Sequence, residues 1–259
     1  QIGDNNQIVA KTGVTVVGDF RRRDIALGGQ GAPLVPAFHQ ALLAHPSERR
    51  MVLNIGGIAN LSMLIPGQPV RGYDTGPGNM VMDALAARLT EGKARFDDGG
   101  RLAAQGTVNA GLLAWMMQDP YLSAPPPKTT GREVYGAAYV DALCAHARTL
   151  GVSLRDTLST ATRFTAECIR EGVERFCPQR PERLIVGGGG SHNPVLMELL
   201  QADLPGCEVV TNEALGLDSD AKEAVAFAIL ANEMLHGRCN NAPSATGAAH
   251  PVVMGKLSL

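Results

Sequence analysis

The segment Tyr73-Asp74-Thr75-Gly76-Pro77-Gly78-Asn79 places a single carboxylate between an aromatic residue and a turn built from glycine and proline. The two glycines allow positive φ or close backbone approach to a ligand, and the proline between them stiffens the turn. An apolar stretch precedes the segment and an amphipathic helix is expected to follow it, so Asp74 is well placed to meet a substrate. The same acid could instead cap the following helix or its turn through a side-chain hydrogen bond. The segment alone leaves both roles open.

Two glycine clusters, Gly56-Gly57 and Gly187 to Gly190, each follow a short apolar run. Without a Cβ, such residues let backbone N–H groups approach a phosphate or a nucleotide. Neither cluster is a G-x-x-x-x-G-K-[ST] loop, and neither is a G-x-G-x-x-G turn after the first strand of a dinucleotide-binding unit. Tight turns alone explain most glycine runs. Two runs that follow strands, with an acidic glycine turn between them in the sequence, favour a nucleotide site.

Apolar patterning predicts the elements that must position these residues. Two apolar runs flank Gly56-Gly57 within residues 51–65, which is typical of a β-hairpin, and a third strand is expected at 70–73. The other elements are expected as strands at 14–17, 184–186 and 208–211, and as helices at 36–44, 79–91, 157–176 and 220–235. The proline-rich segment 125–133 is expected to be an exposed or ligand-facing loop without regular structure. Three strands followed by a helix are a typical start of an α/β nucleotide-binding lobe.

The composition is that of an ordinary soluble enzyme. The 259 residues carry a formal net charge of −2, with 4% aromatic residues, and no Lys/Arg run is longer than Arg21-Arg22-Arg23, which argues against a nucleic-acid surface. Five cysteines without a CxxC pair argue against a disulfide framework or a zinc site and favour a reducing cytoplasm. His39 and His192 are isolated in the sequence and are not expected to bind a metal. No stretch has the length of a membrane span, and no signal peptide is visible.

Six strings occur in order along the chain and together carry a resemblance. They are Gly18-Asp19-Phe20-Arg21-Arg22-Arg23-Asp24, Gly29-Gln30-Gly31-Ala32-Pro33-Leu34, Asn54-Ile55-Gly56-Gly57-Ile58-Ala59-Asn60, Tyr73-Asp74-Thr75-Gly76-Pro77-Gly78-Asn79, Lys128-Thr129-Thr130-Gly131-Arg132-Glu133 and Gly188-Gly189-Gly190-Ser191-His192-Asn193-Pro194. The chain resembles the anhydro-N-acetylmuramic acid kinase family, bacterial cell-wall recycling enzymes of the sugar kinase/actin/heat-shock ATPase superfamily. The resemblance runs from Gln1 to the segment Pro243-Ser244-Ala245-Thr246-Gly247 near the end.

The resemblance implies an α/β fold, a ribonuclease H-like lobe of the actin and sugar-kinase type whose mixed sheet is flanked by helices. Residues 1–48 are expected to be the remnant of an N-terminal lobe and 49–259 the C-terminal nucleotide-binding lobe, with the last residues packing back on the N-terminal lobe. The implied reaction uses ATP and Mg²⁺: water opens the anhydro ring of 1,6-anhydro-N-acetylmuramic acid and O6 is phosphorylated, which gives N-acetylmuramic acid 6-phosphate. The family also implies a cytoplasmic homodimer without nucleic-acid or membrane partners.

Matched position by position, Asp74 corresponds to the catalytic base, which takes a proton from the water that attacks the anomeric carbon, and a carboxylate suits that role. The residues that the resemblance places at the substrate are Asp19, Arg22, Thr75, Gly76, Gly78, Asn79 and Glu223. The residues that it places at the nucleotide are Asn54, Gly56, Gly57, Gly188, Gly189, Gly190 and Asn193. Relatives often carry Asp where Asn54 stands, so no residue is assigned to the metal. Arg21 to Arg23 could instead be a surface edge, and Glu223 could instead belong to the cap of a helix that begins at Asp220.

The superfamily's first phosphate loop, a Gly-Thr-Ser-x-Asp-Gly hairpin, has no counterpart in this chain, which begins at Gln1 without a methionine. We therefore expect the sequence to lack an N-terminal segment of the family, and with it part of the phosphate-binding and sugar-binding surface. This leaves a second hypothesis open, an inactive or non-catalytic nucleotide-binding lobe of the actin or chaperone type. A glycosidase that uses no nucleotide does not account for two glycine-rich loops.

Overall fold

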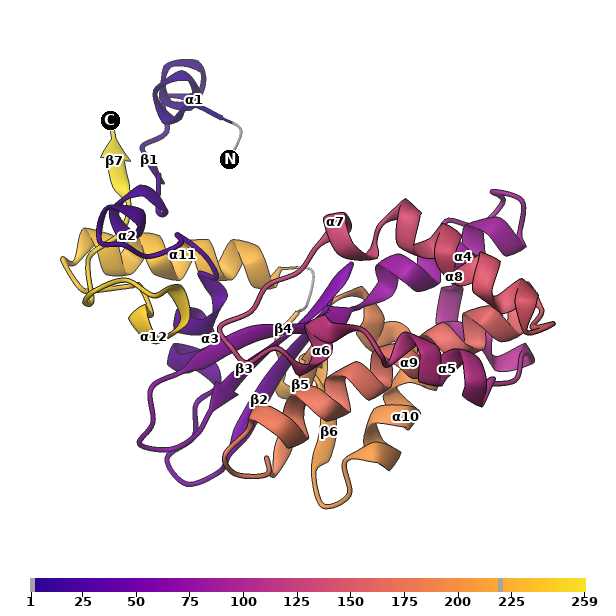
Figure 1. Ribbon diagram of the computed structural model, residues 1–259. Coiled ribbons are helices and arrows are strands. Elements are labelled where there is room, and N and C mark those ends of the chain that lie inside the picture. Colours follow the sequence, from indigo (N-terminus) through magenta and orange to yellow (C-terminus); the bar gives the residue numbers. More distant parts are fainter. Residues whose placement is uncertain (1–2, 219–220) are drawn as a thin grey trace.

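The computed structural model describes residues 3–218 and 221–259, which form a five-stranded mixed sheet with helices on both faces (Figure 1). The strand order is β4-β3-β2-β5-β6. The strands are β2 (Arg50–Ile55), β3 (Ile58–Leu64), β4 (Arg71–Pro77), β5 (Arg183–Gly187) and β6 (Glu208–Thr211). β3 is antiparallel to both β2 and β4, whereas β5 is parallel to β2 and β6 is parallel to β5. This architecture is the expected ribonuclease H-like α/β class.

Helices precede the sheet, connect its strands and follow it. They are α1 (Asn5–Thr12), α2 (Arg22–Ala26), α3 (Val35–Leu43), α4 (Asn79–Leu89), α5 (Ala110–Met116), α6 (Pro120–Ser123), α7 (Arg132–Tyr135), α8 (Ala137–Thr149), α9 (Leu154–Phe176), α10 (Pro194–Asp203), α11 (Lys222–Leu235) and α12 (Pro243–Thr246). Local signals explain where several begin. Ser153 caps α9 by accepting the N–H of Asp156, and α10 begins at Pro194, where the missing N–H of proline costs nothing.

The long helix α9 covers one face of the sheet because its sequence keeps apolar residues on one side. Phe164 and Ile169 are fully buried in the same core cluster as Leu61 of β3 and Tyr73 of β4. The hydroxyl of Tyr73 donates to the carbonyl oxygen of Gly172 at 2.9 Å. Helix and strand are therefore joined by apolar packing and by a buried hydrogen bond.

A smaller apolar cluster covers the opposite face. Side chains alternate along a strand, so Val52 and Ile185 point away from α9 and join Leu43 of α3 in this second cluster. His39 of α3 adds a polar contact, since its Nδ1 lies 3.1 Å from the hydroxyl of Ser62 on β3. Helix α3 is thereby fixed against the antiparallel half of the sheet.

The two ends of the chain lie side by side next to the sheet (Figure 1). The short strand β1 (Val16–Gly18) pairs antiparallel with β7 (Lys256–Ser258). Phe20 shares a third apolar cluster with Leu230 of α11 and with Met254. The division of the chain expected between residues 48 and 49 stays a prediction.

A buried carboxylate, that of Asp24, ties these two ends together. It accepts the N–H of Gly31 at 2.9 Å, the side-chain amide of Asn241 at 3.0 Å and the hydroxyl of Thr246 at 2.8 Å. A buried carboxylate is tolerated when its oxygens are hydrogen-bonded in this way. The loop after α2 and the segment around α12 are thus held in one arrangement.

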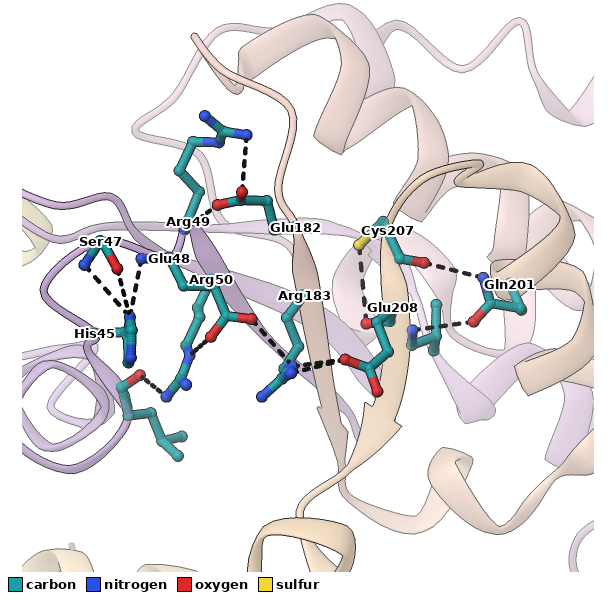
Figure 2. Close-up of polar contacts among 12 residues, drawn as sticks. His45, Ser47, Glu48, Arg49, Arg50, Glu182, Arg183, Gln201, Cys207 and Glu208 are labelled. Atoms are coloured by element: carbon teal, nitrogen blue, oxygen red, sulfur yellow. Dashed lines mark hydrogen bonds and ion pairs between the residues drawn. The ribbon is translucent and has the colours of Figure 1, made fainter.

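Charged side chains link the strands at the edge of the sheet where β2, β5 and β6 begin (Figure 2). The guanidinium of Arg183 lies 3.3 Å from the carboxylate of Glu48 and 2.7 Å from that of Glu208, and Arg50 lies 2.6 Å from Glu48. Such partly exposed ion pairs each stabilise a protein only weakly, so this network mainly fixes how the strands lie beside one another. The opposite edge, where the parallel strands end, is the one at which α/β sheets bind ligands.

The structure departs from the predicted elements in two instructive places. β4 continues to Pro77, because Gly76 and Pro77 pair with Ala59 and Ile58 of β3, so Asp74 lies inside a strand and not at a strand-to-helix turn. The segment 125–133 was expected to lack regular structure, but its last residues begin α7. The predicted hairpin and the other expected strands and helices are present with small shifts at their ends. None of the helices within 3–218 and 221–259 is both long and apolar enough to cross a membrane.

Candidate active site

A cavity of about 960 Å³ lies over the antiparallel half of the sheet and reaches the end of β2 at Asn54. Its wall combines the loop before α3, strands β2 to β4, the segment before α7, the end of α9, and the start of α11 together with α12. Polar wall residues from these parts include Gln30, Asn54, Asp74, Lys128 and Glu223. The volume is that of a typical small-molecule site.

Three polar residues of the wall form a row across the sheet. Asp74 of β4 is the register partner of Asn60 on β3, and Asn60 is the partner of Asn54 on β2. Register partners point to the same face of a sheet, so all three side chains face the cavity. The strand pairing thus places a carboxylate and two amides beside one another. No role is predicted for Asn60 from the sequence alone, although the placement of Asn54 and Asn60 on either side of the glycine turn is a signal for it.

The carboxylate of Asp74 is held by the segment that precedes α7. Its Oδ2 accepts the N–H of Thr130 at 2.9 Å, and its own N–H donates to the carbonyl oxygen of Lys128 at 3.1 Å. The hydroxyl of Tyr121 donates to the carbonyl oxygen of Asp74 at 2.9 Å. Gly78 precedes the first turn of α4, and no side chain caps that turn. Asp74 is therefore not the helix cap that the sequence allowed.

Burial raises the pKa of the Asp74 carboxyl above its ordinary value. The N–H of Thr130 lowers this pKa, the nearby charge of Glu133 raises it, and the charge of Lys128 lowers it. A carboxylate with a raised pKa is a stronger base than free aspartate, yet it is still ionised where the pH exceeds that pKa. Asp74 thus has the properties of a general base in a partly dehydrated site.

Lys128 is a buried cation in the same wall. Its Nζ donates to the carbonyl oxygens of Tyr121 at 3.2 Å and Leu122 at 3.0 Å. The ammonium also lies 4.7 Å from the ring centre of Tyr121 and 4.8 Å from that of Phe176. Burial lowers the pKa of this lysine. Neither Lys128 nor Tyr121 was assigned a role from the sequence, because the contact of Lys128 with Phe176 and the hydrogen bond of Tyr121 to Asp74 join segments far apart in the chain.

The two glycine turns predicted for the nucleotide meet at the start of α4. Asn79 donates its backbone N–H to the carbonyl oxygen of Gly56 at 2.7 Å and its side-chain amide to Ile55 at 3.3 Å. Gly188 has a φ of +82°, and a Cβ there would lie 2.8 Å from the carbonyl oxygen of Ile55 and 3.0 Å from the side-chain oxygen of Asn54. The tips of the turns, Gly57 and Gly189, are exposed. The arrangement offers open backbone at the ends of β2 and β5, next to Asn54.

Thr75, Gly76 and Gly78, which were expected at the substrate, are buried among protein atoms. Thr75 donates its hydroxyl to the carbonyl oxygen of Ala59 at 3.1 Å, and Gly76 packs against Cys168 of α9. A Cβ at Gly78 would overlap the carbonyl oxygen of Gly56. Glycine is required there by the close approach of two protein segments. These residues support the site from within the protein. Their packing against other protein atoms disfavours direct contact with a ligand.

Of the remaining expected site residues, one lies in the cavity wall and the others do not. Glu223, at the start of α11, lies in the cavity wall, whereas Asp220, its alternative capping partner, is outside the described residues. Asp19 and Arg22 form an exposed ion pair at 3.4 Å and are not among the wall residues of the cavity. The side chain of Asn193 caps α10 by accepting the N–H of Leu196 at 3.2 Å.

Over the parts of the chain that the structure describes, no group of three or more His, Cys, Asp or Glu side chains is placed to hold a metal ion. The residues beside Asp74 in the row across the sheet are the neutral amides Asn60 and Asn54. Mg²⁺ prefers carboxylate, phosphate and water oxygens. This donor set suits the hydroxyl groups of a polar ligand better than a magnesium ion held by protein alone.

Comparison with known proteins gives one family. A family model described as Anhydro-N-acetylmuramic acid kinase matches residues 1–258. Among solved structures, xylulose kinase from Rhodospirillum rubrum is 18% identical with a TM-score of 0.46, over 75% of this chain and 40% of that one. The activator of 2-hydroxyisocaproyl-CoA dehydratase from Clostridium difficile, solved with bound ADPNP, is 12% identical with a TM-score of 0.45, over 74% and 63%. Component A of (R)-2-hydroxyglutaryl-CoA dehydratase from Acidaminococcus fermentans is 17% identical with a TM-score of 0.42, over 74% and 68%.

The chain spans 40% to 68% of the length of these three proteins. Identities and TM-scores of this size carry no argument about function.

Proposed function

The chain belongs to the anhydro-N-acetylmuramic acid kinase family, and we propose that it provides the active-site lobe of an ATP-dependent kinase acting on 1,6-anhydro-N-acetylmuramic acid. Water opens the anhydro ring and O6 receives the γ-phosphoryl group, giving N-acetylmuramic acid 6-phosphate and ADP. The observation that carries the proposal is Asp74, a half-buried carboxylate with a raised pKa in the wall of a sugar-sized cavity.

Asp74 takes a proton from the water that attacks the anomeric carbon, C1. The new C1–O bond forms as the bond between C1 and O6 breaks, and O6 leaves with the electron pair of that bond. The freed O6 then attacks the γ-phosphorus of ATP. Asn60 and Asn54, in the same row as Asp74, are the residues we assign to hydrogen bonds with the water and the sugar hydroxyls. Fixing water, sugar and base together supplies much of the rate enhancement that such a reaction needs.

The nucleotide is assigned to the open backbone of the two glycine turns, where Gly57 and Gly189 are exposed. Asn54 borders both these turns and the cavity, so the sugar and the γ-phosphate would meet beside it. Phosphoryl transfer depends mainly on positioning and on neutralising charge. Because the described residues form no carboxylate cluster, we assign Mg²⁺ to the phosphate oxygens of ATP. Membership of the family also supports a bacterial, cytoplasmic homodimer with a role in peptidoglycan recycling.

The proposal is tested by incubating the protein with ATP and 1,6-anhydro-N-acetylmuramic acid and following the phosphorus NMR spectrum for a sugar 6-phosphate. We expect Asp74→Asn to reduce turnover by at least about 1,000-fold while ATP binding, measured by calorimetry, stays within about twofold. Asp141→Asn, a change on the exposed side of α8, is the matched control and should retain turnover. Turnover by Asp74→Asn at the unsubstituted rate would contradict the proposed role. ATP binding without any turnover by the unsubstituted protein would instead favour a non-catalytic nucleotide-binding lobe.

A further inference from the structure

The side chain of Lys128 brings a positive charge into the cavity wall, where the charges of Glu171 and Asp119 act on it without forming an ion pair with it. The residue is only 8% exposed. Among residues 3–218 and 221–259, no carboxylate oxygen lies within 4.0 Å of its Nζ. Its contacts are the carbonyl oxygens of Tyr121 and Leu122 and the faces of two aromatic rings. Removing a charge from water is costly unless it is paired, so a negative group at this position would be strongly favoured.

An ammonium group has three N–H donors, and the two carbonyl oxygens account for two of them. In the described part of the chain, the third has no acceptor within hydrogen-bond distance. The rings of Tyr121 and Phe176 also lie against the ammonium, with their centres 4.7 and 4.8 Å from Nζ, and help to hold it in place. Phe176 is itself a wall residue of the cavity. The lysine is therefore fixed in advance, which lowers the entropy cost of binding an anion.

The charge of Lys128 also acts on Asp74, whose pKa it lowers. The N–H of Asp74 donates to the carbonyl oxygen of Lys128, so the two residues are fixed to each other through the backbone. Both residues belong to the wall of the cavity. The wall contains another cation, Arg175, but its guanidinium lies 3.2 Å from the carboxylate of Glu171 and is already paired.

We infer that Lys128 forms a subsite for the carboxylate of the lactyl ether on the muramic acid ring, and that it gives the site its preference for this acidic sugar over the neutral N-acetylglucosamine analogue. The inference rests on the proposed function, since it assumes that the cavity binds this class of sugar. A charge-assisted hydrogen bond in a partly dehydrated site is strong enough to determine such a preference.

The test compares calorimetric Kd values for two sugars without ATP: 1,6-anhydro-N-acetylmuramic acid, and 1,6-anhydro-N-acetylglucosamine, which has the same ring and no lactyl group. We expect Lys128→Met to weaken binding of the acidic sugar by about 10-fold to 100-fold and to change that of the neutral sugar by less than about threefold. Lys128→Arg retains the charge and should retain most of the preference. Lys93→Met, at an exposed lysine after α4, should bind both sugars as the unsubstituted protein does.

The possible results separate the subsite from the function. An equal loss for both sugars in Lys128→Met, with an unchanged thermal unfolding profile, would overturn the subsite and leave Lys128 a residue that only supports the wall. Arg71 is an exposed residue of the same wall. If Arg71→Met abolishes the preference and Lys128→Met does not, the subsite at Lys128 is overturned and the preference belongs to Arg71. If the unsubstituted protein binds neither sugar, the proposed function itself is wrong. A preference abolished only by Lys128→Met supports the inference.

Discussion

Asp74 on β4 lies directly opposite Asn60 on β3, and the register changes immediately beside this pair. Ala59 pairs with Gly76 while Asn60 pairs with Asp74, so Thr75 is an extra residue on β4. Such β-bulges are frequent next to active sites, where they redirect a side chain. Here the bulge brings the carboxylate and the amide to the same face, above the cavity.

The first prediction concerns the amide of this pair. Asn60→Ala should lower kcat/KM for the proposed reaction by about 10-fold to 100-fold, because one hydrogen bond to the water or the sugar would be lost at the transition state. Steady-state kinetics with coupled detection of ADP measures the effect. Gln68→Ala, at an exposed turn on the same hairpin-rich half of the sheet, serves as the control and should have no effect. Unchanged kinetics in Asn60→Ala would remove Asn60 from the site.

The second prediction concerns the pH dependence of the base. The negative charge of Glu133 raises the pKa of Asp74, so Glu133→Gln should lower that pKa. Asp74 would then stay ionised to lower pH, and the acidic limb of the kcat/KM profile should shift to lower pH. Glu198→Gln, an exposed acid on α10, should leave the limb in place. A shift to higher pH in Glu133→Gln would contradict the assignment of the limb to Asp74.

The third prediction concerns the close contact between the two glycine turns and α4. Gly78→Ala should lower the free energy of unfolding by about 3 kcal/mol, because its Cβ would overlap the backbone of Gly56. We expect ATP affinity to fall as well, since the proposed phosphate turn would be displaced. Gly111→Ala is the matched control: it lies inside α5, where its Cβ would have ordinary contacts, and alanine favours a helix. Denaturant unfolding of both variants decides the matter, and equal stabilities would refute the prediction.

The fourth prediction concerns Asp83 on α4, whose pKa is raised to about 6 by burial and by the nearby charge of Asp97. A raised pKa in the folded state means that the stability present below the unfolded pKa is lost as pH rises through about 6. Asp83→Asn avoids this loss, so it should be more stable than the unsubstituted protein above pH 6. The gain should be of the order of 1 kcal/mol, because solvent screens a half-exposed carboxylate.

Urea unfolding of Asp83→Asn at several pH values tests this. The difference from the unsubstituted protein should shrink as pH falls towards the ordinary value of the carboxyl pKa, 3.8. The control Glu198→Gln, at an exposed acid of α10, should change the free energy of unfolding little at any of these pH values. A difference for Asp83→Asn that is independent of pH would contradict the raised pKa of Asp83.

Features that depend on neighbouring residues could be predicted from the sequence. The hairpin around Gly56-Gly57 follows from two apolar runs and a glycine turn, and the helix ending at Phe176 follows from its apolar periodicity. The string around Asp74 also predicts a functional role for it, and this role stays a prediction. These signals are local because hydrogen bonds within a helix or hairpin join residues close in the chain.

Contacts between distant segments were decided only by the tertiary structure. The strand register aligns Asp74 with Asn60 and Asn54, and a shift of one residue would turn a side chain to the other face. The burial of Lys128 depends on two carbonyls from α6 and on a ring at the end of α9, which no pattern around residue 128 specifies. The sequence by itself determined which local elements form and which residue types could do the chemistry. The packing of the sheet, α9 and the chain ends determined which of those residues share one cavity, because that depends on long-range contacts whose partners the sequence does not name.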